Sequence, residues 1–382
     1  MPGFELIDEQ EKAAVVDIFD NQGGVLFAHG FDALRKGHYQ VREFEQACAN
    51  KFGVEYALAV TSGTSALAIA LKALGIEPGD QVITQAFTFV ASVEAILSIG
   101  AEPILVNIDD TLNMDPIELE QIIGDRTKAI MPVHMLGMAA NMNAISSIAN
   151  KYGLKIVEDN CESIGASLDG KYLGTIGDVG VISFDHGKAL TTGEGGMLLT
   201  NSKVIYDYAR EYHDHGHQNN PKLPRGRDSK RFPGFNYRMT EIQAAIGKVQ
   251  LGKLSFLLEE NAKRYDILHD ILSVVLEPRK VVANCIGQKD CYIFKVDNSL
   301  QRQKILDLLN ENGVGTKNIP DAIEWHCAFY WDHILESSDI ARLEKSKSLL
   351  EDHIAIPIMI GRNEDQYRNI ANEIARICKS NL

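Results

Sequence analysis

A single lysine, Lys188, stands in the segment SFDHGKALTTGEGG, where glycines and a glutamate follow it at close range. Most lysines of soluble proteins are solvated surface residues, so Lys188 is of chemical interest only through the residues that accompany it. Asp159 ends the apolar run IVED, and one further apolar run, VGVISF, separates it from Lys188. An acid at the end of one strand and a lysine just past another can therefore face the same pocket.

Two more segments supply groups that a ligand could use. TSGTSAL, with Gly63 and Thr64, precedes an apolar run; free N–H groups at a helix start can bind phosphate, although such residues are more often an ordinary N-cap. FTF offers Phe87 and Phe89, either of which can stack on a flat ligand or lie in the core. A lysine, a carboxylate, an aromatic ring and a phosphate cradle together suit pyridoxal 5'-phosphate, which needs a Schiff-base lysine, a carboxylate at its ring nitrogen and an anion site.

Strand-like and helix-like segments alternate through most of the chain. The expected strands lie in EYALAV, DQVITQ, EPILVNID, TKAIMPVHM, LKIVEDN and VGVISFD, with helical stretches such as NMNAISSIANKYG between them. This alternation predicts an α/β fold with a mostly parallel sheet. Ligands of such sheets bind at the carboxyl ends of the strands, where the polar groups described above are found.

The last third of the chain has a different pattern. A long helical periodicity begins near residue 241, and a strand, DCYIFKVD, a glycine-ended helix and a last helix over residues 363–379 follow it. We predict a large cofactor-binding domain with its N-terminal segment over residues 1–255, and a small α+β domain over residues 256–382.

Composition narrows the function classes. The 382 residues are 45% hydrophobic and 24% charged, with a net charge of −14, which argues against nucleic-acid and anionic-membrane partners. The chain has no apolar run long enough to span a bilayer and no apolar signal region, so we expect a cytoplasmic protein. Six scattered cysteines without a CxxC pair favour reduced thiols and no metal site. A P-loop is excluded because GxxxxGK[ST] is absent, and a Rossmann dehydrogenase is disfavoured because no GxGxxG follows the first strand.

Taken together, these segments resemble the DegT/DnrJ/EryC1/StrS family of sugar aminotransferases, within the fold-type I pyridoxal-phosphate enzymes. The resemblance covers most of residues 1–255 and fits loosely beyond. It rests on TSGTSALAIAL, FTFVASVEAI, VHMLG, IVEDNCESIGA, GTIGDVGVISFDHGKALTTGEGGMLLTN and GFNYRMTEIQAAIGKVQL. It implies a large domain with a mostly parallel sheet of the seven-stranded type and a smaller C-terminal α+β domain.

The resemblance also implies roles for the residues around the cofactor ring. Lys188 looks like the lysine that binds the cofactor and later moves a proton, and Asp159 like the partner of the ring nitrogen. Phe89 looks like the ring that stacks on the cofactor. The family commonly has glutamine at the position of Glu162, beside the ring oxygen, so this glutamate serves there only if it is protonated or paired.

Four further residues resemble the phosphate contacts of the family. Gly63, Thr64 and Ser183 would bind the phosphate from the same chain. Asn236, in FNYR, looks like a phosphate contact that the neighbouring subunit supplies. The resemblance therefore implies a homodimer with shared active sites.

The implied reaction moves an amino group, with glutamate as the expected donor, to a keto or aldehyde sugar in amino-sugar or surface-polysaccharide biosynthesis. MPGFEL, YHDHGHQNNP and EWHCAFYWDH resemble the 8-amino-3,8-dideoxyoctulosonate transaminase branch, which acts on an eight-carbon keto sugar acid; most of the family acts on nucleotide-linked keto sugars. Candidate substrate-binding histidines are His186, His215, His217 and His326, each of which can instead be a structural loop residue. The family also contains sugar dehydratases in which histidine replaces the lysine, so the presence of Lys188 favours transamination. A sugar dehydratase with the same cofactor and a non-catalytic regulator are the alternatives.

Overall fold

The computed structural model describes residues 3–220, 222–296 and 298–379. Its central sheet has seven strands in the order β1-β9-β8-β5-β4-β2-β3. The strands are Tyr56–Val60 (β1), Gln81–Gln85 (β2), Glu102–Val106 (β3), Thr127–Ile130 (β4), Lys155–Asp159 (β5), Val179–Ser183 (β8) and Gly196–Thr200 (β9). Only β9 runs antiparallel to its neighbours in this sheet. The predicted mostly parallel, seven-stranded sheet is therefore confirmed.

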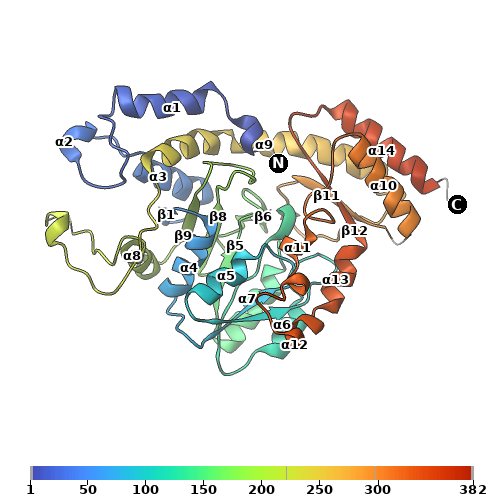
Figure 1. The fold of residues 1–382 in the computed structure, drawn as a ribbon, viewed down its shortest axis with the longest axis horizontal. Coiled ribbons are helices and arrows are strands. Elements are labelled where there is room, and N and C mark those ends of the chain that lie inside the picture. Colours follow the sequence, from blue (N-terminus) through green and yellow to red (C-terminus); the bar gives the residue numbers. More distant parts are fainter. Residues whose placement is uncertain (1–2, 221, 297, 380–382) are drawn as a thin grey trace.

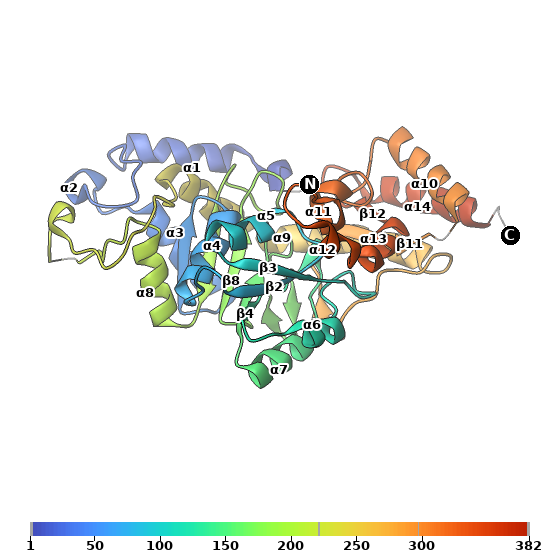
Figure 2. The same ribbon diagram turned by 60° about the horizontal axis from the view of Figure 1, so that its bottom comes forward.

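The strands are buried on both faces, and alternate residues serve different cores. Ala57 and Ala59 of β1 pack into a cluster with α3 (Gln40–Phe52) and α9 (Glu241–Leu272), whereas Leu58 and Val60 pack against α4 (Gly63–Ala73) on the other face. This follows from the two-residue period of side chains along a strand. Figure 2 shows helices on both sides of the sheet. Double coverage explains why the strands read as continuous apolar runs.

The other helices connect and cover the sheet. In the first part of the chain they are Glu9–Asp20 (α1), Asp32–Arg35 (α2), Ala91–Ser98 (α5), Pro116–Ile122 (α6), Met142–Tyr152 (α7) and Lys203–Tyr212 (α8), with the 3-10 turns Gly3–Leu6 (η1), Met135–Gly137 (η2) and Arg225–Arg227 (η3). A small antiparallel sheet joins Cys285–Ile286 (β10), Ser167–Leu168 (β6) and Lys171–Tyr172 (β7).

A second packed unit forms at the far end of α9. Strands β11 (Cys291–Lys295) and β12 (His353–Pro357) pair antiparallel, and Leu268 and Leu272 of α9 belong to their core cluster. Figure 1 shows α9 running from above the main sheet to this unit, so the predicted boundary at residue 255 falls inside a continuous helix and stays a prediction. The remaining helices are Ser299–Glu311 (α10), Ile323–His326 (α11), Ala328–Tyr330 (η4), Ser337–Ala341 (α12), Glu344–Glu351 (α13) and Glu364–Lys379 (α14).

Candidate active site

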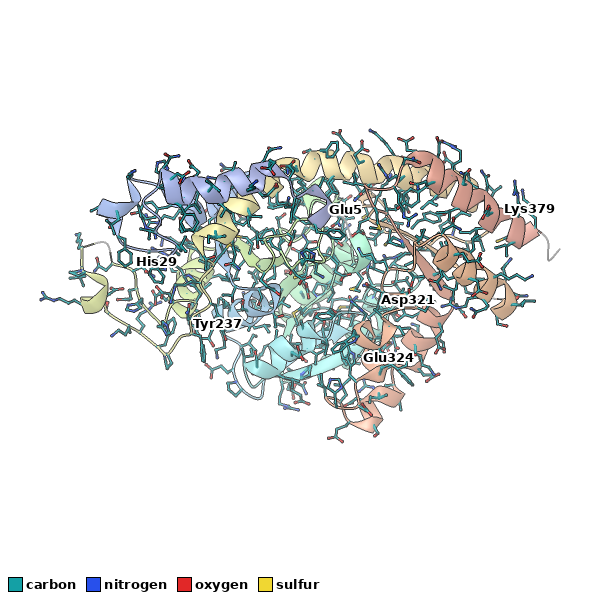
Figure 3. The ribbon with its side chains drawn as sticks, turned by 45° about the horizontal axis from the view of Figure 1, so that its top comes forward. Glu5, His29, Tyr237, Asp321, Glu324 and Lys379 are labelled. Atoms are coloured by element: carbon teal, nitrogen blue, oxygen red, sulfur yellow. The ribbon has the colours of Figure 1, made fainter. Side chains whose placement is uncertain are left out.

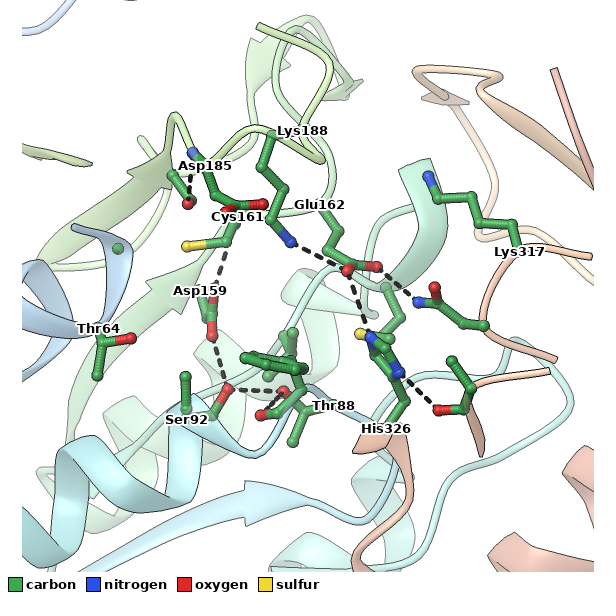
Figure 4. A pocket seen from close by; sticks show the side chains of 18 of the residues that line it. Thr64, Thr88, Ser92, Asp159, Cys161, Glu162, Asp185, Lys188, Lys317 and His326 are labelled. Atoms are coloured by element: carbon green, nitrogen blue, oxygen red, sulfur yellow. Dashed lines mark hydrogen bonds and ion pairs between the residues drawn. The ribbon is translucent and has the colours of Figure 1, made fainter. Parts of the chain in front are cut away.

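A cavity of about 650 Å³ lies where the carboxyl ends of β1, β2, β5 and β8 meet the C-terminal part of the chain. Most of the residues that the sequence predicts at the site line it: Gly63, Thr64, Phe89, Asp159, Glu162, Ser183, Lys188 and His326. Figure 4 shows the side chains of Asp159, Lys188 and His326 converging from separate elements. The convergence has a topological cause, because parallel strands end at the same edge of a sheet.

The N-terminus of α4 forms one wall. Ser62 caps the helix, its Oγ accepting from the Ser65 N–H at 3.1 Å, while the first turn of any helix leaves N–H groups without intrahelical partners. A Cβ at Gly63 would come within 2.9 Å of the Ser183 Cβ and 3.0 Å of the Cys161 Sγ. Glycine is therefore required by close packing, and this turn offers a cradle for an anion.

Asp159 presents a fixed carboxylate at the end of β5. Its Oδ2 accepts from the Ser92 Oγ at 2.8 Å, and its Oδ1 accepts from the Cys161 N–H at 3.1 Å. The side chain of Thr88 lies 2.6 Å from the same Ser92 hydroxyl. A buried carboxylate held in this way is suited to pairing with a protonated ring nitrogen.

Lys188 and Glu162 form an ion pair inside the cavity. Lys188 Nζ donates to Glu162 Oε1 at 3.1 Å, and Asn318 Nδ2 donates to Oε2 at 3.3 Å. Burial opposes the charge of Glu162, but Lys188, His326 and Lys317 outweigh it and hold the pKa of Glu162 at about 2. Burial likewise lowers the pKa of Lys188, but the charge of Glu162 outweighs it, so this pKa is raised. The sequence predicts that a glutamate can serve at this position only if it is protonated or paired, and in this chain Glu162 is paired with Lys188.

His326 faces the same carboxylate from α11. Its Nδ1 lies 2.8 Å from the carbonyl oxygen of Ala322, and a carbonyl only accepts, so Nδ1 carries the hydrogen. Burial lowers the pKa of His326 despite the nearby charge of Glu162. The neutral ring therefore presents Nε2 as an acceptor, 4.0 Å from Glu162 Oε1. Its centroid is 5.3 Å from that of Phe89, whose ring forms a half-exposed wall of the cavity.

Sequence reasoning missed several contributors. Lys317 lines the cavity and pairs with Asp290, both nearly fully buried. Asn318 and Ser92 also line it. The segment GVGTKN carries no motif that indicates such a role, and its arrival at the cavity depends on how the second unit packs against the sheet.

Four predicted residues lie elsewhere in this chain. His186 stacks on Phe4, with ring centroids 5.4 Å apart. His217 Nδ1 lies 3.6 Å from a carboxylate oxygen of Asp228, His215 adopts a left-handed backbone conformation with φ of 57°, and Asn236 bridges Asp214 in a short antiparallel contact. Phe87, the other ring considered, is fully buried in the core. The four residues do not line the cavity, so their functional roles stay predictions.

Comparison with known proteins agrees with the family that the sequence motifs resemble. The sequence model of the DegT/DnrJ/EryC1/StrS aminotransferase family matches residues 28–375. A GDP-perosamine synthase from Caulobacter vibrioides is 44% identical over 56% of this chain and 56% of its own length, so the match spans little more than half of that relative. A GDP-perosamine synthase from Vibrio cholerae is 31% identical over 88% of this chain and 90% of its own length.

Solved structures share the fold over almost the whole chain. DesV of S. venezuelae, solved with a ketimine intermediate, superposes with a TM-score of 0.84 at 25% identity, covering 98% of this chain and 96% of its own. Among the residues that the structure describes, no helix combines the length and apolarity needed to cross a membrane.

Proposed function

The chain belongs to the pyridoxal-phosphate-dependent DegT/DnrJ/EryC1/StrS aminotransferase family, and on that premise we propose that it transfers an amino group from glutamate to a keto or aldehyde sugar. The observation that carries the proposal is the presence of Lys188, the Asp159 carboxylate and the N-terminus of α4 in one cavity. These groups are the three that the cofactor requires.

The residues of the cavity fit the cofactor. Gly63 and Thr64 would hold its phosphate at the start of α4 with help from Ser183, and Asp159 would pair with its ring nitrogen. The exposed face of Phe89 would stack on its ring. When bound, pyridoxal phosphate supplies an electron-withdrawing ring and a carbon that carries the amino group.

Lys188 performs the proton transfer. With the cofactor bound, its Nζ would hold the cofactor in the resting protein and, once displaced by the donor, would take up the proton that leaves the donor's alpha carbon. The same nitrogen would return a proton when the sugar reacts in the second half of the cycle. Glu162 orients this nitrogen, because the two groups are already 3.1 Å apart.

The proposal covers two acceptor classes, an eight-carbon keto sugar acid and a nucleotide-linked keto sugar. The names of the Caulobacter and Vibrio relatives support the second class, while the segments around His215 and His326 resemble the branch that uses the first. Assay of both acceptors with the amine-loaded protein separates the classes, because only the true acceptor regenerates the starting spectrum.

The proposed assembly is a homodimer in which Asn236 of one chain reaches the phosphate site of the other. In the single chain Asn236 and its neighbour Phe235 are exposed, which leaves both free to meet a second copy. Mixing Lys188→Ala with Asn236→Ala tests this assembly. Mixed dimers contain one intact site and recover part of the activity if the site is shared, whereas no recovery contradicts sharing.

The test of the reaction is the visible absorbance spectrum of the purified protein before and after glutamate is added. A cofactor band that glutamate shifts, and that Lys188→Ala lacks, is the expected result. A band that no amino donor shifts would favour the sugar dehydratase. A protein without any cofactor, even after incubation with pyridoxal phosphate, would favour a non-catalytic regulator.

A further inference from the structure

The N-terminal strap, residues Gly3–Leu6 of η1, lies between two segments that form the active-site cavity. One is the turn that carries Lys188, and the other is the stretch after β12 that carries Met359. Figure 3 shows Glu5, a strap residue, near the middle of the molecule. The strap itself does not line the cavity, so any effect on the reaction must pass through these two segments.

The first contact is to the main chain of Lys188 itself. The Gly3 N–H donates to the Lys188 carbonyl at 3.1 Å. Gly3 is buried, and a Cβ at this position would clash with the same carbonyl oxygen. Phe4 then stacks on His186, two residues before Lys188, with an interplanar angle of 19°. The strap therefore fixes both the backbone at Lys188 and the turn that precedes it.

The second contact is to the opposite wall. Glu5 Oε2 accepts from the Ile360 N–H and Oε1 from the Gly361 N–H, each at 3.0 Å. These residues directly follow Met359, which lines the cavity. One carboxylate thus holds two successive backbone donors of the C-terminal unit.

The strap is also anchored to α9, which restrains its position. Lys253 Nζ donates to the Leu6 carbonyl at 2.6 Å and to both carboxylate oxygens of Glu11 in α1, at 2.8 and 2.9 Å. Glu11 in turn accepts from the Asp8 N–H in a capping box that starts α1. The strap therefore links a rigid helix pair to both walls of the cavity.

We propose that Gly3, Phe4 and Glu5 are positioning residues, which hold Lys188 at a fixed place relative to the wall at Met359; this rests on the proposed transaminase function. A reacting group displaced by about 1 Å costs on the order of a hundredfold in rate. The effect should therefore appear in the chemical step, with substrate binding less affected. Met1 and Pro2 of the segment MPGFEL lie outside the described residues, but its residues Gly3–Leu6, together with His186, gain a role in positioning in place of the predicted contact with substrate.

The experiment compares Glu5→Ala, Glu5→Gln and Gly3→Ala with the control Glu9→Ala. Glu9 is an exposed residue of α1 whose side chain pairs with Lys12. The first readout is hydrogen–deuterium exchange of the peptide around residues 184–192 in the cofactor-free protein. The second is the limiting rate constant of the glutamate half-reaction and the glutamate concentration that gives half of this rate. The melting temperature is measured in parallel.

We expect Glu5→Ala and Gly3→Ala to raise exchange around Lys188 and to lower the limiting rate constant roughly tenfold or more. The half-saturating glutamate concentration should change less. Glu5→Gln keeps one acceptor oxygen and should recover part of the loss. If exchange and the limiting rate constant match those of Glu9→Ala, or if only the melting temperature falls, the proposal is overturned. A wild-type protein that does not react with glutamate would instead refute the transaminase function, and the exchange data would still test the strap.

Discussion

Glu162→Gln tests how the cavity controls the reactivity of Lys188. At 3.1 Å and an effective dielectric constant of about 20, two unit charges attract by about 5 kcal/mol. Glutamine keeps an acceptor oxygen for Lys188, and a hydrogen bond to a charged group is worth about 2 kcal/mol. The protonated form of Lys188 therefore loses about 3 kcal/mol relative to the neutral form, which corresponds to about a hundredfold change in their ratio.

The assay is the rate at which the cofactor-free protein captures pyridoxal phosphate, measured by borohydride trapping across a range of pH. Only the neutral amine attacks a carbonyl, so we expect Glu162→Gln to react up to about a hundredfold faster near neutral pH. The advantage should vanish at high pH, where Lys188 is neutral in both proteins. Equal rates at neutral pH, or a ratio that does not depend on pH, would refute the role assigned to the ion pair.

The other predictions concern the remaining groups of the cavity. Asp159→Asn should slow the glutamate half-reaction about a hundredfold, measured by stopped-flow absorbance. Gly63→Val should weaken cofactor binding in a titration, because its Cβ meets Ser183 at 2.9 Å. His326→Asn keeps a donor for Ala322 and removes the Nε2 acceptor, so we expect slower reaction with the sugar and an unchanged half-reaction with glutamate. The stabilising effect of Glu162, measured by chemical unfolding against Glu162→Gln, should be present above its ordinary pKa of 4.5 and disappear as pH falls through about 2.

The sheet and the edge that binds the ligand were predictable because both follow from local patterns. Apolar runs that end in polar residues mark parallel strands, so Gly63, Asp159 and Ser183 were expected at one edge before any packing was known. The direction of β9 was not predictable, since GMLLT is a plain apolar run. Lys317 and Asn318 were missed for another reason: their place depends on contacts between the two packed units, and no sequence spacing encodes such contacts.

The candidate histidines also show that residue type alone does not predict which side chains lie at the cavity. His326 lines the cavity and His217 does not, although both stand in sequence segments with a similar mixture of aromatic and acidic residues. The difference lies in tertiary partners: α11 is bonded to the segment after β2, where the Thr88 N–H donates to the His326 carbonyl at 2.9 Å, whereas His217 faces Asp228 within its own loop. Residue type identified the chemistry, but only the packing of the chain decided which residue can take part in it.

Glu162 shows how packing also decides what a residue does at its position. A glutamine there could only donate or accept a hydrogen bond, whereas the ionised carboxylate binds Lys188 as its counter-ion and faces His326 as well. In the cofactor-free protein this charge holds Lys188 in its protonated form, and a protonated amine cannot attack a carbonyl. Lys188 can therefore capture the cofactor only after its proton is lost. The carboxylate at this position therefore makes Lys188 a paired cation in the cofactor-free protein, a state that the neutral amide of a glutamine would stabilise less.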